Sequence, residues 1–269
     1  MVNNTYIPKD DYAEINRLEK LGHNTEELTR NAIEKAGIKN ANRILDVGCG
    51  IGTVSQYIAS NYPDKRIVGV DISEKFIDEA KKKSVELGLK NTEYKVCNAE
   101  NIPFDSDSFD LIICRFLLQH IKKWENVVQE FYRLLGDGGK IVIIETDWGG
   151  QFVYPPCKQY DFLNNMVIKF RKYIGVNVYI GRSICVDLAK YHFKSLDYYC
   201  DMKLYDSNNC DDGKFKIKER TKVYAKIAKK IIFLRPIIIR CVNKIHRFLD
   251  SVDFILTDCR FILVAEKKK

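Results

Sequence analysis

Three glycines and two aspartates near residue 50 have the types and spacing of a nucleoside-binding site. Gly48, Gly50 and Gly52 alternate along a short turn, Asp46 precedes them, and Asp71 ends the next apolar run. Glycine permits positive φ and lets a ligand lie against the backbone where a Cβ would collide with it. The two oxygens of Asp71 suit the two vicinal hydroxyls of a ribose. The pattern therefore predicts a bound nucleoside.

The spacing of the glycines also indicates which kind of nucleoside. They follow G-x-G-x-G, whereas a dinucleotide fingerprint is G-x-G-x-x-G with a pyrophosphate on the helix N-terminus. Thr53 stands where the third glycine of that fingerprint would be. Asp46 would repel a pyrophosphate but could hold an ammonium group through ordered water. A cationic ligand is favoured over a dinucleotide.

A strand, a helix and a second strand must position these residues. Residues 44–47 form an apolar run typical of a buried parallel strand, and residues 67–70 form a second one. Between them, Ile51, Val54 and Ile58 have helical spacing. This βαβ unit is the element around which the rest of the chain is arranged.

The βαβ unit and the segments after it resemble the class I S-adenosylmethionine-dependent methyltransferases. The similarity is close from about Ala41 to Trp148 and looser at the end of the chain. It implies an α/β, Rossmann-like sheet of seven mostly parallel strands in the order 3-2-1-4-5-7-6, with strand 7 antiparallel, helices on both faces and a helical lid. The stretches that carry it are LDVGCGIG, GVDIS, VCNAENIPF, FDLIICRFLLQHI, FYRLLGDGGKIVIIETDW and TDCRFILVAEKK.

The resemblance implies a cofactor site for S-adenosylmethionine. In related enzymes an acid at the Asn98 position accepts from the adenine amino group, and asparagine keeps that accepting carbonyl. The alternative for Asn98 is a turn-capping role. The expected cofactor residues are Asp46, Gly48, Gly50, Gly52, Asp71, Ile72, Asn98, Ala99 and Arg115.

His120 is the one candidate for a catalytic residue. The stretch RFLLQHI resembles the phosphoethanolamine N-methyltransferases, in which a histidine at this place works with an N-terminal tyrosine to take the acceptor's proton. Tyr6 and Tyr12 are available for the partner role, and an imidazole pKa near ~6.5 suits a general base. The alternative is that His120 only orders the loop after the fourth strand.

Three residues after the fifth predicted strand could bind a cationic acceptor. Glu145 and Asp147 supply carboxylates and Trp148 an aromatic face. They could equally do no more than end the strand. Both readings stay open at this point.

The remaining segments are expected to cover the site. Residues 1–40 form an N-terminal helical cover, residues 41–269 the methyltransferase domain, and two insertions, about 146–181 and 206–255, a substrate cap. The pattern breaks in the first insertion, which follows no regular period.

Helix signals are clearest at a few positions in this outer part of the chain. Asn24 and Glu27 are spaced as a capping box, and Gly37 is placed as a helix stop. A helix is expected over Arg182–His192 and a strand over Leu196–Leu204. These signals place helices before the sheet and after the first insertion.

Composition narrows the functional class. The chain has 269 residues with 46% hydrophobic content, begins with a polar stretch, and has no uncharged apolar run approaching ~18 residues, so no membrane span is expected. Its nine cysteines are odd in number and occur singly, which disfavours zinc sites and a disulfide framework. We expect a cytoplasmic protein that holds no metal.

The positive charge is concentrated in one segment. Residues 214–247 hold twelve Lys or Arg and one acid, a local charge of +11 against +8 for the whole chain. Apolar residues at helical spacing form two pieces broken at Pro236. The segment could be a lid, a contact with an anionic membrane through 214–249, or a nucleic-acid surface.

Other enzyme classes fit less well. A short-chain dehydrogenase needs Tyr-x-x-x-Lys on one helix face, but Pro155 and Pro156 separate Tyr154 from Lys158. The stretch after the fourth strand lacks the pattern of amino-directed DNA methyltransferases. We therefore expect methyl transfer by in-line displacement to a small-molecule or lipid-like acceptor. A nucleoside-binding module without turnover and a nucleic-acid methyltransferase are the alternatives, and the acceptor atom and oligomeric state are not determined.

Overall fold

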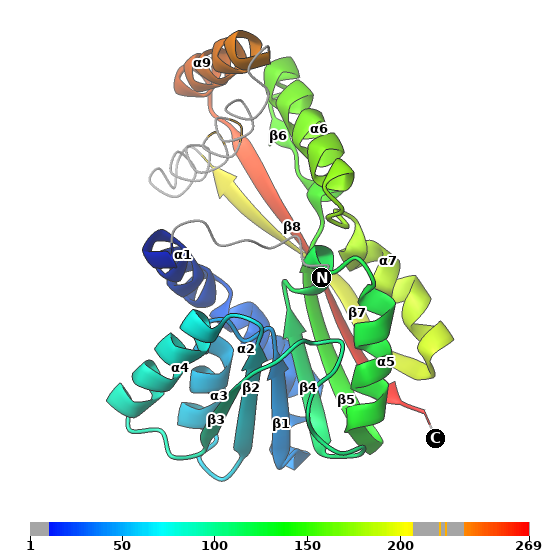
Figure 1. Cartoon of the computed structure of the whole chain (residues 1–269). Helices are drawn as coiled ribbons and strands as arrows, with labels where there is room; N and C mark the ends of the chain where they lie inside the picture. The colour runs from blue at the N-terminus through cyan, green and yellow to red at the C-terminus, as the bar shows by residue number, and fades with distance from the viewer. Residues whose placement is uncertain (1–10, 207–220, 222–223, 225–233, 269) are drawn as a thin grey trace.

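A computed structural model describes residues 11–206, 221, 224 and 234–268, with side chains from Glu14 onward (Figure 1). The strands are β1 Arg43–Val47, β2 Arg66–Asp71, β3 Thr92–Val96, β4 Phe109–Arg115, β5 Leu135–Thr146, β6 Val153–Tyr154, β7 Phe193–Asp206 and β8 Ile255–Lys267. The α-helices are α1 Asp11–Asn24, α2 Glu26–Lys35, α3 Thr53–Asn61, α4 Glu74–Glu86, α5 Trp124–Leu134, α6 Lys158–Tyr173, α7 Ile180–Asp187 and α9 Arg235–Ser251. Short 3₁₀ helices are η1 Ile38–Asn40, η2 Leu118–His120, η3 Trp148–Gly150 and η4 Leu188–Tyr191.

One sheet runs through the molecule in the order β3-β2-β1-β4-β5-β8, and β8 also pairs with β7 and β6. The first five strands are parallel and β8 is antiparallel to β5. This confirms the predicted order, with β7 and β8 in the places of the sixth and seventh family strands. The sheet has eight strands because the two-residue β6 adds to β8. The order reverses between β1 and β4, where open α/β sheets bind ligands.

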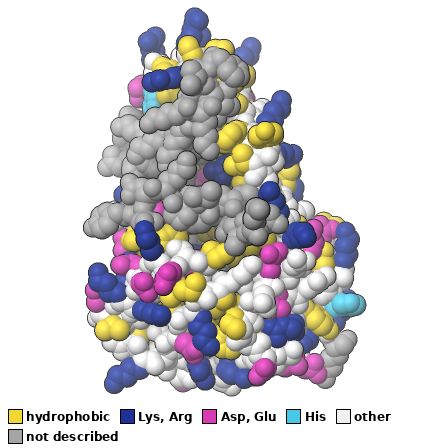
Figure 2. Space-filling model, viewed as in Figure 1, with side chains coloured by type: hydrophobic (Ala, Val, Ile, Leu, Met, Phe, Trp, Pro, Cys, Tyr) yellow, Lys and Arg dark blue, Asp and Glu magenta, His cyan; other side chains and the backbone are white. Residues whose placement is uncertain are grey.

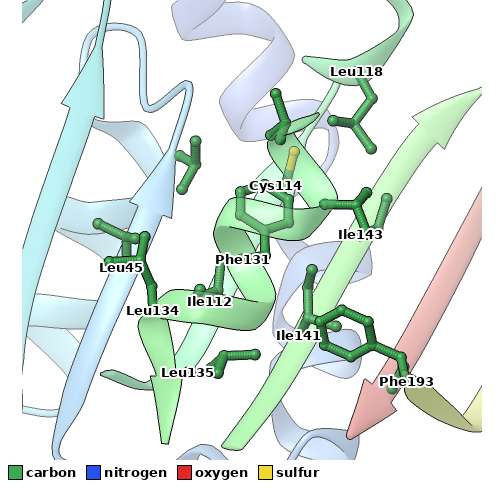
Figure 3. Close-up of a cluster of buried hydrophobic side chains, with 14 of the residues drawn as sticks. Leu45, Ile112, Cys114, Leu118, Phe131, Leu134, Leu135, Ile141, Ile143 and Phe193 are labelled. Carbon is green, nitrogen blue, oxygen red and sulfur yellow. The ribbon is translucent and has the colours of Figure 1, made fainter. Parts of the chain in front are cut away.

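Helices cover both faces because the parallel strands are apolar on both sides. On one face, α5 places Phe131 and Leu134 among Ile112 and Ile141 of the sheet (Figure 3). On the other face, α2 and α3 pack against the same strands through a second buried cluster. Fully burying each such side chain stabilises the fold by about 1.5–3 kcal/mol, so this double layer holds the carboxyl edge of the sheet rigid.

Beyond that edge, a second core forms where β7 and β8 continue past the end of β5 (Figure 1). It unites parts of the two predicted insertions, since α6 and β6 pack with α9 and the ends of the two long strands. The buried members include Val153, Tyr160, Leu163, Val167, Tyr205, Ile238, Ile245, Leu249, Phe254 and Leu256. The segments expected to form a cap therefore share one apolar cluster.

The structure corrects several element boundaries. The first insertion is not irregular, because it contains α6, whose N-cap Cys157 makes no side-chain capping bond and so gave no start signal. The helix expected over Arg182–His192 is α7 followed by η4. The strand expected over Leu196–Leu204 is longer, since β7 pairs with β8 along its whole length. Strand β5 begins at Leu135 and includes residues 136–139, which are rich in glycine.

The predicted capping box at Asn24 and Glu27 is wrong. The N-cap of α2 is Thr25, and its side chain makes no capping bond. Its hydroxyl instead donates to the carbonyl of Leu21 and accepts from Arg115. An N-cap threonine is expected to bond to the first backbone N–H groups of its helix. Here the hydroxyl of Thr25 bonds to Arg115, which is distant in the sequence.

Helix α1 lies at the carboxyl edge of the sheet, above the glycine turn (Figure 1). A Cβ on Gly50 would lie 3.5 Å from Cδ1 of Leu18, and one on Gly22 would collide with Thr53 at 2.9 Å. An ion pair between Glu19 and Lys83 joins α1 to α4. These contacts fix α1 against the βαβ unit.

The basic segment is described only in part. Helix α9 begins next to Pro236 as predicted, whereas the helical piece expected before it lies almost wholly outside the described residues. Figure 2 shows Lys and Arg side chains gathered with hydrophobic ones at the end of the molecule that α9 forms. Of the helices that the structure describes, none has the length and apolarity to cross a bilayer.

Candidate functional site

The glycine turn between β1 and α3 requires glycine at each of its three positions. The φ angles are +73° at Gly48, +55° at Gly50 and +80° at Gly52, a region that other residues rarely occupy. A Cβ on Gly52 would lie 2.8 Å from the hydroxyl of Tyr94, and one on Gly48 would lie 3.0 Å from Leu117. At Gly50 only Leu18 comes within 4 Å, so this glycine faces the more open side of the turn.

The backbone N–H groups of this turn are already used within the protein. Those of Gly48 and Cys49 donate to the carbonyl of Val70 at 2.8 and 3.0 Å, and that of Gly50 donates to the Asp71 carboxylate at 2.9 Å. A pyrophosphate needs free N–H groups at such a turn. The three N–H groups are therefore not available to a pyrophosphate, which agrees with the expectation that the site does not bind a dinucleotide.

Asp71 presents a carboxylate with one hydrogen bond on each oxygen. Oδ2 accepts from Gly50 N and Oδ1 from Ser73 N, both at 2.9 Å. Burial raises the pKa of Asp71, and the N–H groups of Ser73, Gly50 and Ile72 oppose that rise. Each oxygen keeps a lone pair, which suits two ribose hydroxyls. Ile72 follows with 40% of its surface exposed.

Asp46 is buried below the turn. Its carboxylate accepts a hydrogen bond from the Ser55 hydroxyl at 2.7 Å, which ties β1 to the first turn of α3. Burial raises the pKa of Asp46 to about 6, while Ser55 and Arg115 pull it down. The group is thus mostly ionised at pH 7. A contact with a ligand ammonium stays a prediction.

Asn98 and Ala99 follow β3 at the same edge of the sheet. The Asn98 side-chain oxygen accepts from the N–H of Glu100 at 3.1 Å, and its backbone oxygen accepts from Asn101 at 3.0 Å. The turn-capping role is therefore present in the structure. The side-chain oxygen has a second lone pair, so the predicted adenine contact is compatible with it.

Arg115 ends β4 and ties three elements together. Its guanidinium donates to the hydroxyls of Thr25 and Thr29 on α2 at 2.6 and 3.2 Å, and to that of Thr53 on α3 at 3.1 Å. Burial lowers the pKa of Arg115 to about 10, and Asp46 opposes that fall. The sequence identified Arg115 as a site residue but gave no sign of the three threonines.

A groove of about 280 Å³ lies between α1, α2, α3 and α4. Its walls include Arg115 and Thr53, together with Glu19, His23 and Lys83. It includes neither Asp71 nor any of the three turn glycines. The groove therefore lies beside the predicted nucleoside site and is distinct from it.

His120 lies on η2, which follows a sharp change of direction at Phe116, where φ is +57°. Burial lowers the pKa of His120 to about 4, Arg171 and Arg17 add to that effect, and Glu14 opposes it. The imidazole is therefore neutral at pH 7. Its predicted partner Tyr6 and the side chain of Tyr12 lie outside the described residues.

The two carboxylates at the end of β5 bond to loops of the protein, and Glu145 lies within the strand, not after it as predicted. Glu145 is fully buried and accepts from the N–H of Leu118 at 2.6 Å, which holds η2 in place. Burial raises the pKa of Glu145 to about 8, so it is mostly protonated at pH 7. Asp147 accepts two bonds from Arg182 at 2.5 Å each and one from Gly150 at 2.8 Å.

Trp148 already has a cation against its ring. The guanidinium carbon of Arg171 lies 3.9 Å from the ring centroid, and the indole N–H of Trp148 donates to the side chain of Gln119 at 3.5 Å. The backbone of Gln119 also accepts from Asn177 at 3.0 Å. These contacts bring the end of α6 to η2. A cationic acceptor would therefore have to share or displace Arg171 at the ring of Trp148.

Comparisons with known proteins agree with this geometry. The family model described as a methyltransferase domain matches residues 45–143. The ubiquinone/menaquinone biosynthesis C-methyltransferase of Desulfotalea psychrophila is 30% identical over 168 residues, which are 62% of each chain. Phosphoethanolamine N-methyltransferase 1 of Arabidopsis thaliana is 32% identical over 44% of this chain and 23% of its own length. The matches thus span less than two thirds of these relatives.

A solved structure extends the similarity of fold to nearly the whole chain. The crystal structure of a putative methyltransferase from Bacillus halodurans C-125 has a TM-score of 0.60 at 20% identity, covering 90% of this chain and 99% of that one. These findings support a class I S-adenosylmethionine-dependent methyltransferase whose methyltransferase domain includes residues 45–143. They support S-adenosylmethionine as its cofactor.

The residues present fit that cofactor. The open side of Gly50 and the spare lone pairs of Asp71 suit an adenosine, and the satisfied N–H groups of the turn suit a ligand without phosphate. The ionised Asp46 suits a ligand that carries positive charge. In the part of the chain that the structure describes, no three His, Cys, Asp or Glu side chains are grouped as metal ligands.

Sequence reasoning missed two sets of contacts to the predicted site residues. Arg171 carries no motif, and only the docking of α6 brings it to His120 and Trp148. The three threonines that hold Arg115 come from two separate helices. The polar residues of α2 at i and i+4, Thr25 and Thr29, were the one local sign of a buried polar partner.

Proposed function

We propose that this chain transfers a methyl group from S-adenosylmethionine to a small-molecule or lipid-like acceptor. The observation that carries the proposal is the carboxylate of Asp71, held by the N–H groups of Gly50 and Ser73 beside a turn of three left-handed glycines. It lies at the carboxyl edge of a sheet whose strand order reverses next to it. The cofactor, when bound, supplies a sulfonium methyl group that an acceptor nucleophile can displace.

The residues of the chain would contribute mainly by orientation. Asp71 would hold the ribose, Asn98 and Ala99 the adenine, and Asp46 the ammonium of the amino-acid part. Holding the reacting atoms ~3–3.5 Å apart and in line can supply ~7–11 kcal/mol of rate enhancement without a strong base. Helix α1, with Leu18 above Gly50, would exclude water from the site.

His120 is the proposed general base. It is half-buried and neutral at pH 7, so it can accept a proton from the acceptor, although a pKa of about 4 makes it a weaker base than an exposed histidine. The alternative role, ordering η2, is shared with Glu145, which bonds to Leu118 in the same loop.

The acceptor class rests on the relatives. One relative is named for ubiquinone and menaquinone biosynthesis and another for phosphoethanolamine. Quinones and phosphoethanolamine are both small molecules. We place the reaction in the cytoplasm, on the single occurrence of the cysteines. Contact of 214–249 with a membrane is a further proposal, supported by Ile237 and Ile239, which are 49% and 47% exposed beside Arg235 and Arg240.

The test is calorimetric titration with S-adenosylhomocysteine. We expect micromolar binding to the native chain and at least a ~100-fold loss in Asp71→Ala, because two charge-assisted hydrogen bonds are removed. Asp137→Ala, at an exposed position in the Gly136–Gly139 stretch, is the matched control and should bind like the native chain. Absence of binding to the native chain would favour a module that keeps the fold without turnover.

A further inference from the structure

Arg171 is a half-buried cation whose hydrogen-bonding groups have no acceptor in the described part of the chain. Its guanidinium makes no hydrogen bond or ion pair there, and its one described partner is the ring of Trp148, 3.9 Å away. Stacking on a ring uses the face of the guanidinium and leaves the N–H groups on its edge pointing outward. Those N–H groups are a fork for two oxygens of one anion.

The fold holds Arg171 beside the reaction site. The segment after α6 turns back, with the N–H of Val176 donating to the carbonyl of Arg171 at 2.9 Å and that of Asn177 donating to Gln119 at 3.0 Å. Gln119 precedes His120 on η2 and also accepts from Trp148. Arg171 is near enough to His120 to lower the pKa of its imidazole.

The acids on this side of the site have partners other than Arg171. Glu14 accepts three hydrogen bonds from Arg17, at 2.6 to 3.0 Å. Asp147 is held by Arg182, and Glu145 is mostly protonated at pH 7 and bonded to Leu118. Burial and the charge of Arg17 lower the pKa of Arg171 to about 10, so it stays charged at pH 7.

We propose that Arg171 is the recognition group for an oxyanion on the methyl acceptor, a phosphate or a carboxylate bound through the edge of its guanidinium while Trp148 supports the face. This inference rests on the proposed function and names the acceptor's chemical class. A bound oxyanion also neutralises the charge that weakens His120 as a base. The acceptor would thus raise the basicity of the residue proposed to deprotonate it.

The test uses inorganic phosphate and acetate as probes, with chloride at equal ionic strength as the reference. The readout is the fluorescence of the full chain at pH 7, because Trp148, one of two tryptophans, contacts Arg171. The variant is Arg171→Met. Lys169→Met is the matched control, since it removes the same charge from an exposed position on the same helix.

We expect a saturable, millimolar response to phosphate or acetate in the native chain and in Lys169→Met, and at least a ~10-fold weaker one in Arg171→Met. Arg171→Lys keeps the charge without the fork and should fall in between. Whichever probe binds more tightly identifies the oxyanion. Phosphate should also inhibit methyl transfer competitively against the acceptor and not against the cofactor.

Titration of every variant with S-adenosylhomocysteine separates the two proposals. Cofactor binding in the native chain without any anion response would overturn this inference and leave the proposed function intact. An equal anion response in Arg171→Met would overturn it as well. An anion response without cofactor binding would show an oxyanion site unconnected with methyl transfer, which also contradicts it. If Arg171→Met fails to bind cofactor, the comparison is made with Arg171→Lys.

Discussion

The cofactor side and the acceptor side of the site are built in different ways. The cofactor side comes from one continuous βαβ unit, and the N–H groups of its turn are paired with Val70 and Asp71. The proposed acceptor side is assembled from α1, η2, the end of β5 and α6, and the residues that the structure describes place no anion at the edge of Arg171. The polar groups of the cofactor side are therefore paired before the ligand binds. On the other side, the positive charge of Arg171 would be paired by the ligand.

The segment from Arg115 to His120 joins the two sides. Arg115 is held by Thr53 of the cofactor side and by Thr25 and Thr29 at the start of α2, and Leu117 packs over Gly48. Leu118 is held by Glu145 on the acceptor side. The comparison teaches that the two sides share one segment, although the groups around η2 come from elements outside the βαβ unit.

The largest expected effect is that of Gly52→Val. A β-branched side chain at φ +80° is strained, and its Cβ would meet Tyr94 at 2.8 Å and Ala80 at 3.0 Å. We expect a loss of about 3 kcal/mol or more in the free energy of unfolding and no measurable cofactor binding. Urea denaturation and calorimetry measure the two effects.

Gly88→Ala is the control for this change, because φ there is +69° with no atom within 4 Å of the added Cβ. It should cost only about 1 kcal/mol and keep cofactor binding. Binding by Gly52→Val within tenfold of the native value would show that the cofactor side is not as complete as the structure indicates.

Next in size is His120→Ala, which tests the acceptor side. If His120 is the base, turnover should fall about 100-fold with cofactor affinity unchanged. Because the pKa of His120 is about 4, activity should rise with pH through that value and be level near neutrality. Steady-state kinetics over pH measures both. A loss under about fivefold would leave His120 only the role of ordering η2.

Glu145→Gln tests the support of η2 through the pH dependence of stability. Burial raises the pKa of Glu145 from 4.5 to about 8, so the folded chain keeps a proton that the unfolded chain releases between these values. Stability should therefore fall as pH rises from 5 to 8, by an amount on the order of 2 kcal/mol, and Gln should remove that fall. Urea denaturation at both pH values measures it, and equal slopes for the two proteins would refute it.

The smallest effect is expected for Asn98→Ala, on the cofactor side. Loss of one hydrogen bond to adenine should weaken cofactor binding about fivefold, or ~1 kcal/mol. Asn98→Asp keeps an accepting oxygen and should bind nearly as the native chain does. Calorimetry compares the three proteins. Unchanged affinity in Asn98→Ala would leave the side chain only its bond to Glu100.

The sequence was enough to predict the strands, turn and helix of the βαβ unit because the signals there are local. Apolar runs, the spacing of three glycines and helical spacing each lie within a few neighbouring residues. Ser73, next to Asp71, caps α4 by accepting from the N–H of Phe76. The strand order followed from the family resemblance and was confirmed.

Long-range contacts decided the rest. Thr25 is the N-cap residue of α2, but its hydroxyl makes no capping bond and instead accepts a hydrogen bond from Arg115, 90 residues away in the chain. Helix α6 had no capping signal, and only its packing against α9 and the ends of β7 and β8 shows why it forms. The meeting of Arg171 with Trp148 and His120 depends on how these elements pack. Local sequence specifies backbone conformation, but which distant side chains become neighbours is set by tertiary packing.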